Sequence, residues 1–148
     1  AGATDKAIEF YEKALEENPH DKHAYANLGS TLLYKKPKQA KEYLQKALNI
    51  DPEHDIALIE LGKIDKSEGN TVAAQVKFRK AYDLYLKQWK TNSLPKYAYG
   101  WFATVAEELE ENNFAKEIRA SAPKTESEAY YNKENLSMTK TKALTNNN

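Results

Sequence analysis

The sequence predicts an all-α fold in which antiparallel helix pairs stack on one another. The first observation is a repeated stretch: "IEFYEKALEENP" at residues 8–19 returns as "KEYLQKALNIDP" at residues 41–52, each with Lys-Ala-Leu and a proline five residues after the alanine. The second is the recurrence of Leu-Gly at residues 28–29 and 61–62. Since one helix pair cannot bury its own apolar face, repeated pairs are expected to stack.

Three predicted helices share one apolar stripe. In each helix, an alanine is followed four residues later by a large apolar residue and then, three residues further on, by a second alanine. These steps place all three side chains on one face of a helix with a 3.6-residue period. The three sets are Ala7, Tyr11, Ala14; Ala40, Leu44, Ala47; and Ala74, Phe78, Ala81.

The Leu-Gly dipeptides predict a second kind of helix, which pairs with the first kind. Gly29 and Ala40 are small, so the two antiparallel helices of a unit can approach each other closely there. Leu28 and Leu44 are expected to fill the space beside this contact. Pro37 marks a tight turn between the two helices, because proline cannot continue a preceding helix.

The predicted organisation is a solenoid followed by a polar tail. The solenoid covers residues 1–123, with a half repeat at 1–19, repeats at about 22–52 and 55–88, and a degenerate repeat at about 95–123; the tail covers residues 124–148. Pro19 and Pro52 end one unit and start the next, because each disfavours helix at the residue before it. The helix that includes Ala74–Trp89 is expected to run past its usual end.

The end of the chain is the least regular part. Pro95 is a good first-turn residue for the degenerate repeat, in which Tyr99, Phe102 and Ala103 take the aromatic, leucine and glycine roles. The tail is rich in Ser, Thr, Lys and Asn, a composition typical of disorder. Tyr130 and Tyr131 nevertheless suggest a second possibility, in which residues 126–136 dock on the solenoid.

These residues resemble the tetratricopeptide repeat family. A unit of that family carries an aromatic residue, Leu-Gly and a tyrosine on one helix, then Ala, Phe and Ala on a second helix, then Pro, with a period of about 34 residues. The matching sets are Tyr25, Leu28, Gly29, Ala40, Leu44, Ala47 and Pro52, and then Leu58, Leu61, Gly62, Gly69, Ala74, Phe78 and Ala81. Asp65 and Leu86 depart from the second set, where tyrosine and proline are expected. The resemblance implies a right-handed superhelical solenoid of antiparallel helix pairs.

The resemblance also implies a function. In this family the first helix of each unit lines a concave groove that holds an extended peptide or a partner helix. Carried over by position, the groove residues are His23, Asn27, Ser30, Tyr34, Ile56, Ile59, Lys63, Lys66, Tyr97, Trp101, Thr104 and Glu108. If this register holds, Ile56, Ile59 and Trp101 are exposed apolar residues, which is typical of a binding surface. Packing of Trp101 on the preceding helix is the alternative.

One class of ligand is disfavoured by the same comparison. Family members that grip the C-terminal carboxylate of chaperones use a set of Lys, Asn and Arg side chains. Asn27 matches one member of that set, but Ile56 and Glu60 stand where the next unit should supply Lys and Arg. Because Glu60 would repel a carboxylate, we do not expect the resemblance to extend to that ligand.

Composition and motifs argue against several other functions. With 22 basic and 22 acidic residues the chain has no net charge to attract nucleic acid, and no apolar run approaches the 18–20 residues that membrane insertion needs. We expect no enzyme activity and no cofactor, because cysteine and phosphate-binding glycine loops are absent. His20 and His54 are expected to be exposed turn residues rather than metal ligands. The acidic run at residues 107–111 and the lysines between residues 77 and 90 are expected to be solvated helix faces.

The prediction that follows is a protein-interaction module that is not an enzyme, and two alternatives stay open. The first alternative is a scaffold or regulatory fragment of a larger protein, including an enzyme with its catalytic part elsewhere, and the orphan first helix favours it. The second is a self-associating structural protein that forms a homodimer through the helix at residues 5–18. The sequence leaves the compartment open, with a soluble, cytoplasmic protein favoured. No signal peptide is visible, but the chain begins at Ala1, so a processed or truncated N-terminus also stays open.

Overall fold

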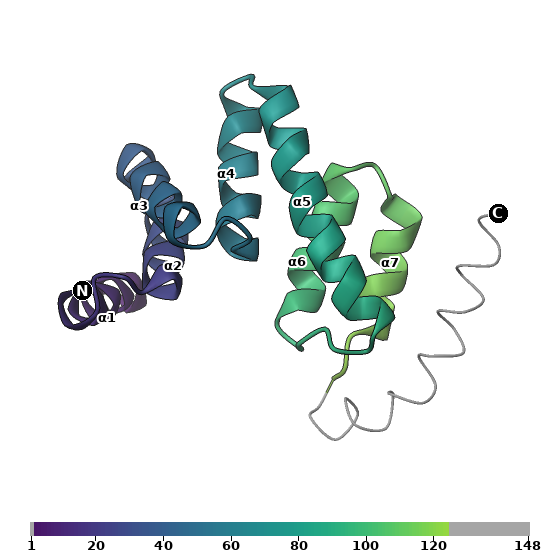
Figure 1. Ribbon diagram of the computed structural model, residues 1–148, viewed down its shortest axis with the longest axis horizontal. Helices are drawn as coiled ribbons and strands as arrows, with labels where there is room; N and C mark the ends of the chain where they lie inside the picture. The colour runs from purple at the N-terminus through teal and green to yellow at the C-terminus, as the bar shows by residue number, and fades with distance from the viewer. Residues whose placement is uncertain (1, 125–148) are drawn as a thin grey trace. The chain divides into compact units, whose positions relative to one another are not determined.

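The computed structural model describes residues 2–124, and every regular element in that range is an α-helix (Figure 1). The helices are α1 (Ala3–Glu17), α2 (Lys22–Leu32), α3 (Pro37–Ile50), α4 (Asp55–Ser67), α5 (Thr71–Lys90), α6 (Ala98–Glu108) and α7 (Asn112–Ser121). This confirms the all-α helical-repeat fold class. The docking hypothesis for residues 126–136, with Tyr130 and Tyr131, falls outside the described residues.

Contacts between Cα atoms divide the described residues into two compact units, unit 1 up to Ala81 and unit 2 from Tyr82. Unit 1 contains α1 to α4 and the first part of α5, whereas unit 2 contains the rest of α5 together with α6 and α7. The boundary therefore falls inside the long helix α5.

Unit 1 is built by sequential packing of neighbouring helices. α1 lies against α2, α2 makes its most extensive contact with α3, and α3 lies against α4 (Figure 1). Two apolar clusters hold these helices together. The first consists of Leu28, Leu32 and Ala40, against which Ile8, Tyr11 and Leu15 of α1 pack. The second consists of Ala26, Leu44, Ala47, Ala57, Leu61 and Ile64.

Two glycines allow the paired helices of unit 1 to approach each other closely. A Cβ atom added to Gly29 would lie 2.6 Å from Leu44 Cγ and 3.1 Å from the Ala40 carbonyl oxygen. A Cβ atom added to Gly62 would lie 2.6 Å from Cε1 of Phe78. Both distances are far below van der Waals contact, so only glycine fits where α2 crosses α3 and where α4 crosses α5.

The turns between these helices are fixed by local hydrogen bonds and by charge. Asp21 caps α2, because its carboxylate accepts from the backbone N–H groups of His23 and Ala24 at 2.9 and 3.0 Å. Pro37 occupies the first turn of α3, where its missing N–H costs nothing. Lys22 Nζ lies 2.6 Å from Asp51 Oδ2, which joins the start of α2 to the end of α3.

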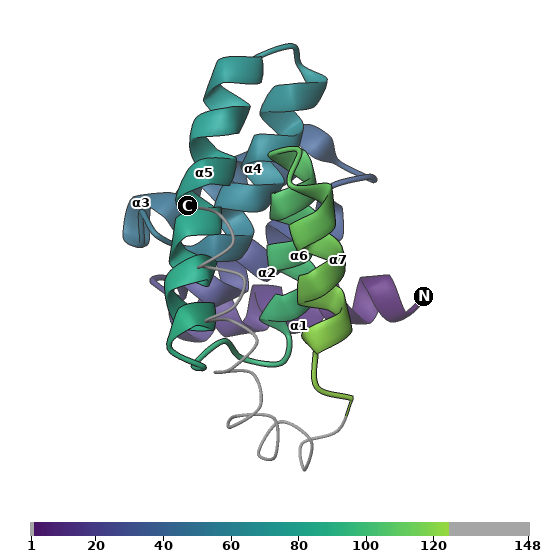
Figure 2. The same cartoon turned by 90° about the vertical axis from the view of Figure 1, so that its right-hand side faces the viewer.

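Unit 2 is held together by aromatic side chains. α6 and α7 pack against each other in both views of the ribbon (Figures 1 and 2). Phe102 of α6 is completely buried, and its ring meets Phe114 of α7 edge to face, with centroids 5.7 Å apart and an interplanar angle of 87°. Tyr82, Tyr85 and Trp89 of α5 complete this aromatic cluster around Phe102. In unit 2, aromatic volume therefore replaces the close glycine contact seen in unit 1.

Candidate functional site

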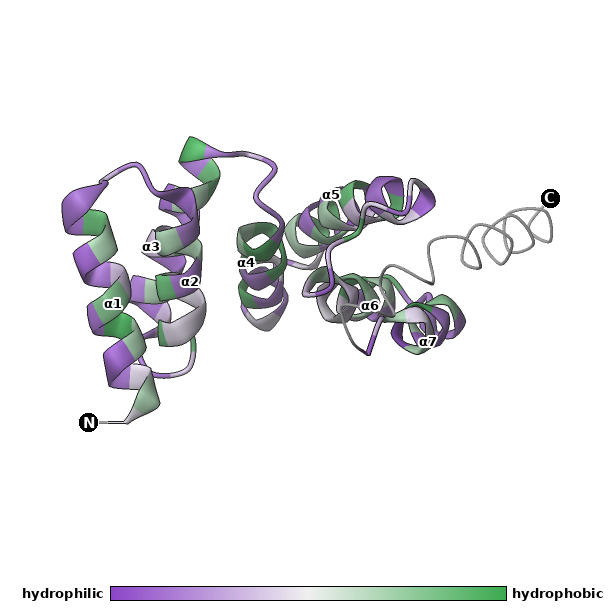
Figure 3. Ribbon diagram, turned by 90° about the horizontal axis from the view of Figure 1, so that it is seen from below, coloured by the Kyte–Doolittle hydropathy of each residue, from purple (hydrophilic) through white to green (hydrophobic). Residues whose placement is uncertain are grey.

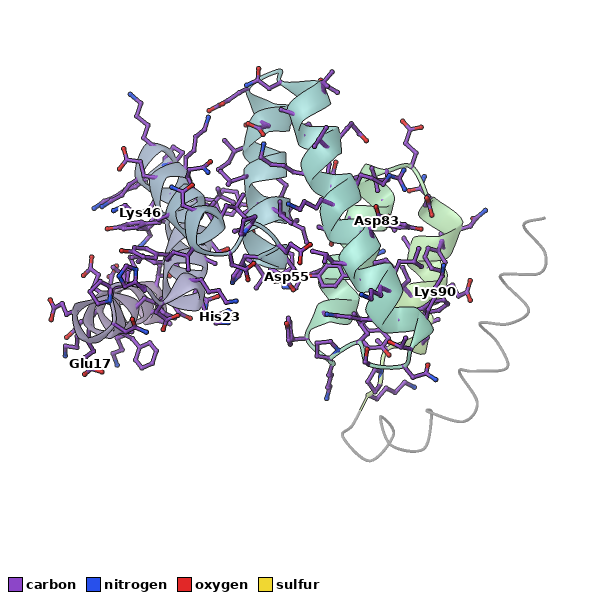
Figure 4. The ribbon with its side chains drawn as sticks, viewed as in Figure 1. Glu17, His23, Lys46, Asp55, Asp83 and Lys90 are labelled. Atoms are coloured by element: carbon purple, nitrogen blue, oxygen red, sulfur yellow. The ribbon has the colours of Figure 1, made fainter. Side chains whose placement is uncertain are left out.

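α2 and α4 lie side by side and run in the same direction in unit 1. At their starts, His23 of α2 and His54, which precedes α4, are in hydrogen-bond contact. Towards their ends, Tyr34 and Lys63 line the same pocket. Figure 4 shows the start of each helix, marked by His23 and Asp55, at the same end of unit 1. This pairing brings together the groove residues that the sequence analysis assigned to two separate repeats.

Most of the eight residues predicted in unit 1 have accessible side chains. His23, Tyr34 and Lys66 are exposed, and Tyr34 is 93% exposed, just beyond the end of α2. The half-buried residues are Asn27, Ser30, Ile56 and Lys63. We call His23, Asn27, Ser30, Tyr34, Ile56, Lys63 and Lys66 the α2–α4 face.

Ile59 does not fit the prediction that it is an exposed groove residue. Its side chain is completely buried. The reason is that α4 is covered on most of its surface, with eight of its thirteen residues buried, and Figure 3 shows several hydrophobic stretches on this helix. Ile59 therefore acts as core, and of the two isoleucines predicted for the groove only Ile56 retains accessible surface.

The four predicted residues of unit 2 form a strip along α6. Tyr97 precedes the helix and is 62% exposed, whereas Trp101, Thr104 and Glu108 are half-buried. They lie beside the buried stripe that includes Phe102, and Thr104 Oγ1 donates a hydrogen bond to the Gly100 carbonyl at 3.0 Å. Trp101 therefore keeps part of its surface accessible, an intermediate between the two possibilities that the sequence left open.

A pocket of about 410 Å³ opens at the far end of the α2–α4 face. Leu33, Pro37 and Ile64 give it an apolar lining, and Tyr34 stands at its edge. The other lining residues are Lys38, Lys41, Lys63, Ser67 and Glu68. The pocket thus forms where the end of α2, the start of α3 and the end of α4 converge, and all of its residues belong to unit 1.

The rim of this pocket carries more positive than negative charge. Lys41 Nζ lies 2.6 Å from Glu68 Oε2, and Lys63 Nζ lies 3.5 Å from the buried carboxylate of Glu60. Lys38 is exposed and forms no ion pair within residues 2–124. Three lysines against one glutamate leave the lining with an excess of positive charge.

Sequence reasoning missed the interaction between two histidines. His54 is not an exposed turn residue: it is 3% exposed, and its Nε2 lies 3.0 Å from Nδ1 of His23. The backbone N–H of Ala57 donates to Nδ1 of His54 at 3.4 Å, so His54 also caps α4. Since Nδ1 accepts, Nε2 must carry the proton of the neutral ring and donate it to His23. The two residues are 31 positions apart, and only the alignment of both repeats could have paired them.

Burial makes this histidine resist protonation. The pKa of His54 is lowered from its ordinary value of 6.5, mainly because burial disfavours the charged ring, and the charges of His23 and Lys22 act in the same direction. Asp55 and Asp51 oppose the shift but do not cancel it. Among residues 2–124, no group of three or more His, Cys, Asp or Glu side chains could hold a metal ion. The 3.0 Å contact between the two rings makes the pair a hydrogen-bonded joint between α2 and the start of α4.

Part of the acidic run in unit 2 is engaged in contacts within that unit. The guanidinium of Arg119 donates to both carboxylate oxygens of Glu107, with 2.9 Å between Nη2 and Oε2. Glu111 accepts a hydrogen bond of 2.5 Å from the hydroxyl of Tyr82. In unit 1, Lys77 lies 2.5 Å from Asp65, the residue that replaces the family tyrosine. These five charged groups thus have partners within their own units and are not simply solvated.

None of the helices within residues 2–124 is both long enough and apolar enough to cross a bilayer.

Comparison with protein families supports the reading of the repeats. The family model described as tetratricopeptide repeat matches residues 2–21 and 23–54, which cover α1, α2 and α3. This segment belongs to the tetratricopeptide repeat family. Tetratricopeptide repeats generally mediate protein–protein interactions, and the family is typically non-catalytic. No curated protein gives a significant match to the chain.

Proposed function

We propose that this chain is a protein-interaction module whose α2–α4 face binds a peptide segment or a partner helix. The proposal rests on one observation above all, the open pocket of about 410 Å³ with the exposed ring of Tyr34 at its edge. A volume of this size falls within the range of about 300–1,000 Å³ that is typical of ligand sites. An aromatic ring beside an apolar pocket is also a common anchor of protein interfaces.

The rest of the face favours an elongated ligand. His23 lies at the start of α2 and Tyr34 just beyond its end, so a ligand laid along this helix would pass both. Helices this long span about 15–17 Å at 1.5 Å per residue. An extended peptide of about five residues covers the same distance. The half-buried amide of Asn27 lies between these ends and supplies groups for hydrogen bonds to its backbone.

Selection from a random peptide library on the whole chain would test this proposal. Peptides selected on the wild-type chain should lose about tenfold in affinity for Tyr34→Ser, since removal of an aromatic anchor typically costs at least about 1 kcal/mol. Phe10→Ser is the matched control, because Phe10 is a 68% exposed aromatic residue on α1, away from this face. Peptides that bind wild type and Tyr34→Ser equally would overturn the proposal, as would a selection that yields none.

A second candidate function is self-association through α1, and it rests on a different observation. No residue of α1 is fully buried, and Phe10 stands exposed beside Tyr11, with ring centroids 5.5 Å apart. A second copy of α1 would cover this surface. Sedimentation equilibrium should then show a dimer that Phe10→Glu dissociates, and a monomer at all concentrations would eliminate this candidate.

A further inference from the structure

We propose that the pocket at the end of the α2–α4 face selects an acidic segment of a partner protein. In this complex one bulky apolar side chain of the segment enters the pocket, and carboxylates on both sides of it contact the lysines at the rim. The inference rests on the proposed function, because it names the chemical class of partner for the same face.

The apolar lining accounts for the anchor. Ile64 is only 8% exposed and belongs to the second apolar cluster of unit 1, and Leu33 packs against the same cluster. Pro37 contributes a rigid ring to the wall. A leucine or phenylalanine side chain that enters here loses contact with water against groups whose positions are already fixed by the core. Burial of such a side chain is the main attractive contribution that this pocket offers.

The lysines at the rim of the pocket are the reason to expect a negatively charged partner segment. Lys41 is held by Glu68 at 2.6 Å, and Lys63 faces Glu60 at 3.5 Å. Lys38 lies in the first turn of α3 and forms no ion pair within residues 2–124. Lys35 and Lys36 precede it in the turn and are exposed, and Lys35 has Asp5 as a partner at 3.5 Å. An acidic segment would supply the counter-charges that this corner of unit 1 lacks.

Side-chain carboxylates fit this site better than the phosphates of nucleic acid. The pocket floor is apolar, so a phosphate placed in it would lose its hydration without gaining a partner there. Across the whole sequence, 22 basic residues are balanced by 22 acidic ones, whereas nucleic-acid sites draw on a local or global excess of positive charge. We therefore commit to an acidic protein segment and treat nucleic acid as an outcome of the test.

The experiment uses three synthetic peptides of equal length with blocked termini, so that no terminal carboxylate takes part. The first combines Asp and Glu with a central Leu-Phe, the second replaces its acids by Lys, and the third replaces Leu-Phe by Ser-Ser. Affinity for the full chain is measured by fluorescence anisotropy. We expect binding of the first peptide only, weakened about fivefold when salt is raised from low to several times the physiological level.

Charge reversal at one exposed lysine provides the matched pair of variants. Lys38→Glu should weaken the first peptide about fivefold, consistent with the loss of one surface charge pair. This variant should fold normally, because an acidic residue in the first turn of α3 is favoured by the helix dipole. Lys116→Glu is the control: Lys116 is exposed on α7 in unit 2, so the variant has the same net charge with the α2–α4 face unchanged.

The outcomes separate this inference from the proposed function. Equal binding of the acidic and basic peptides, or an equal effect of Lys38→Glu and Lys116→Glu, would overturn the inference. So would binding of a single-stranded RNA oligonucleotide that competes with the acidic peptide. If library peptides depend on Tyr34 yet carry no acidic residues, the proposed function stands and only the inference fails.

Discussion

The helices within the α2–α3 pair and within the α6–α7 pair pack against each other through different kinds of residue. In unit 1, α2 and α3 approach each other at Gly29, which leaves no room even for a methyl group beside Leu44. In unit 2, Ala103 stands where the glycine is expected, and the rings of Phe102 and Phe114 fill the space between α6 and α7. The α2–α3 pair thus depends on the absence of a side chain at Gly29, whereas the α6–α7 pair depends on two large aromatic side chains.

This difference explains which parts of the chain can be recognised as repeats. A small residue at a helix crossing leaves a fixed spacing of Gly, Ala and Leu in the sequence, and the family match covers residues 2–54, where that spacing is most complete. Aromatic packing tolerates many arrangements of its rings, so it leaves a weaker pattern. The two pairs should also fail under different substitutions, and the predictions below use this.

The largest effect is expected when the aromatic cluster of unit 2 loses its centre. Phe102→Ala should lower the free energy of unfolding by about 3–5 kcal/mol, because it removes a completely buried ring and leaves a cavity. Urea denaturation followed by circular dichroism measures this change. Phe10→Ala, at a 68% exposed phenylalanine, is the control and should change stability little. A small effect for Phe102→Ala would mean that its neighbours do not depend on it.

A single methyl group should distinguish the two ways of packing. Gly29→Ala should destabilise the chain by about 1–3 kcal/mol, because the new Cβ would lie 2.6 Å from Leu44 Cγ and 3.1 Å from a backbone oxygen. Gly100→Ala places the same methyl in α6, where no atom lies within 4 Å, and should stabilise by about 0.5–1 kcal/mol through helix propensity. Thermal melts of the two variants should therefore shift in opposite directions. Shifts of the same sign would contradict the packing of α2 on α3.

A smaller change in the free energy of unfolding is expected when the pH is varied, and it arises from His54 in unit 1. The pKa of His54 is lowered in the folded chain, so the unfolded chain binds a proton first as the pH falls. The free energy of unfolding should therefore decrease as the pH falls through about 6.5, the ordinary pKa of the ring, and keep decreasing until the folded form is protonated. Asp51 does not interfere in this range, because its pKa is lowered from 3.8, chiefly by its hydrogen bond with Lys22.

His54→Asn isolates this contribution. Asparagine retains a side-chain oxygen that can cap α4 but has no group that titrates near neutral pH. Denaturation midpoints at pH 8 and pH 5.5 should differ more for the wild-type chain than for this variant. Equal pH dependence of the two chains would show that the histidine pair does not govern the joint between α2 and α4.

The sequence predicted the helix crossings, which leave a short repeated spacing of residues. It missed the features that arise only when helices distant in the sequence pack together. Gly29, Gly62 and the alanines at steps of four and three report helix crossings, because each crossing involves a short, repeated spacing. The buried state of Ile59 could not be predicted, because it depends on how completely α4 is surrounded. The histidine pair depends on the alignment of two repeats, which the spacing alone does not specify.

The residues that line the pocket were likewise only partly predicted from the sequence. Tyr34 and Lys63 were predicted as groove residues from their positions in the repeat. The proline and lysines of α3 that complete the wall were not, because that helix is not assigned to the groove in the family pattern. Only the packed arrangement of α2, α3 and α4 brings these side chains around one cavity. The two kinds of helix could thus be predicted from the sequence of a single repeat. The residues that line the pocket could not, because they come together only when the helices pack.

Mapping a bound peptide by nuclear magnetic resonance is the most direct test of the claim that unit 1 carries the binding site. The full chain, labelled with ¹⁵N, would be titrated with the acidic Leu-Phe peptide. We expect the largest changes in amide chemical shift at the end of α2, the start of α3 and the end of α4, around Tyr34, Lys38 and Lys63. Changes confined to unit 2, or to α1, would contradict the assignment of the binding site to the α2–α4 face.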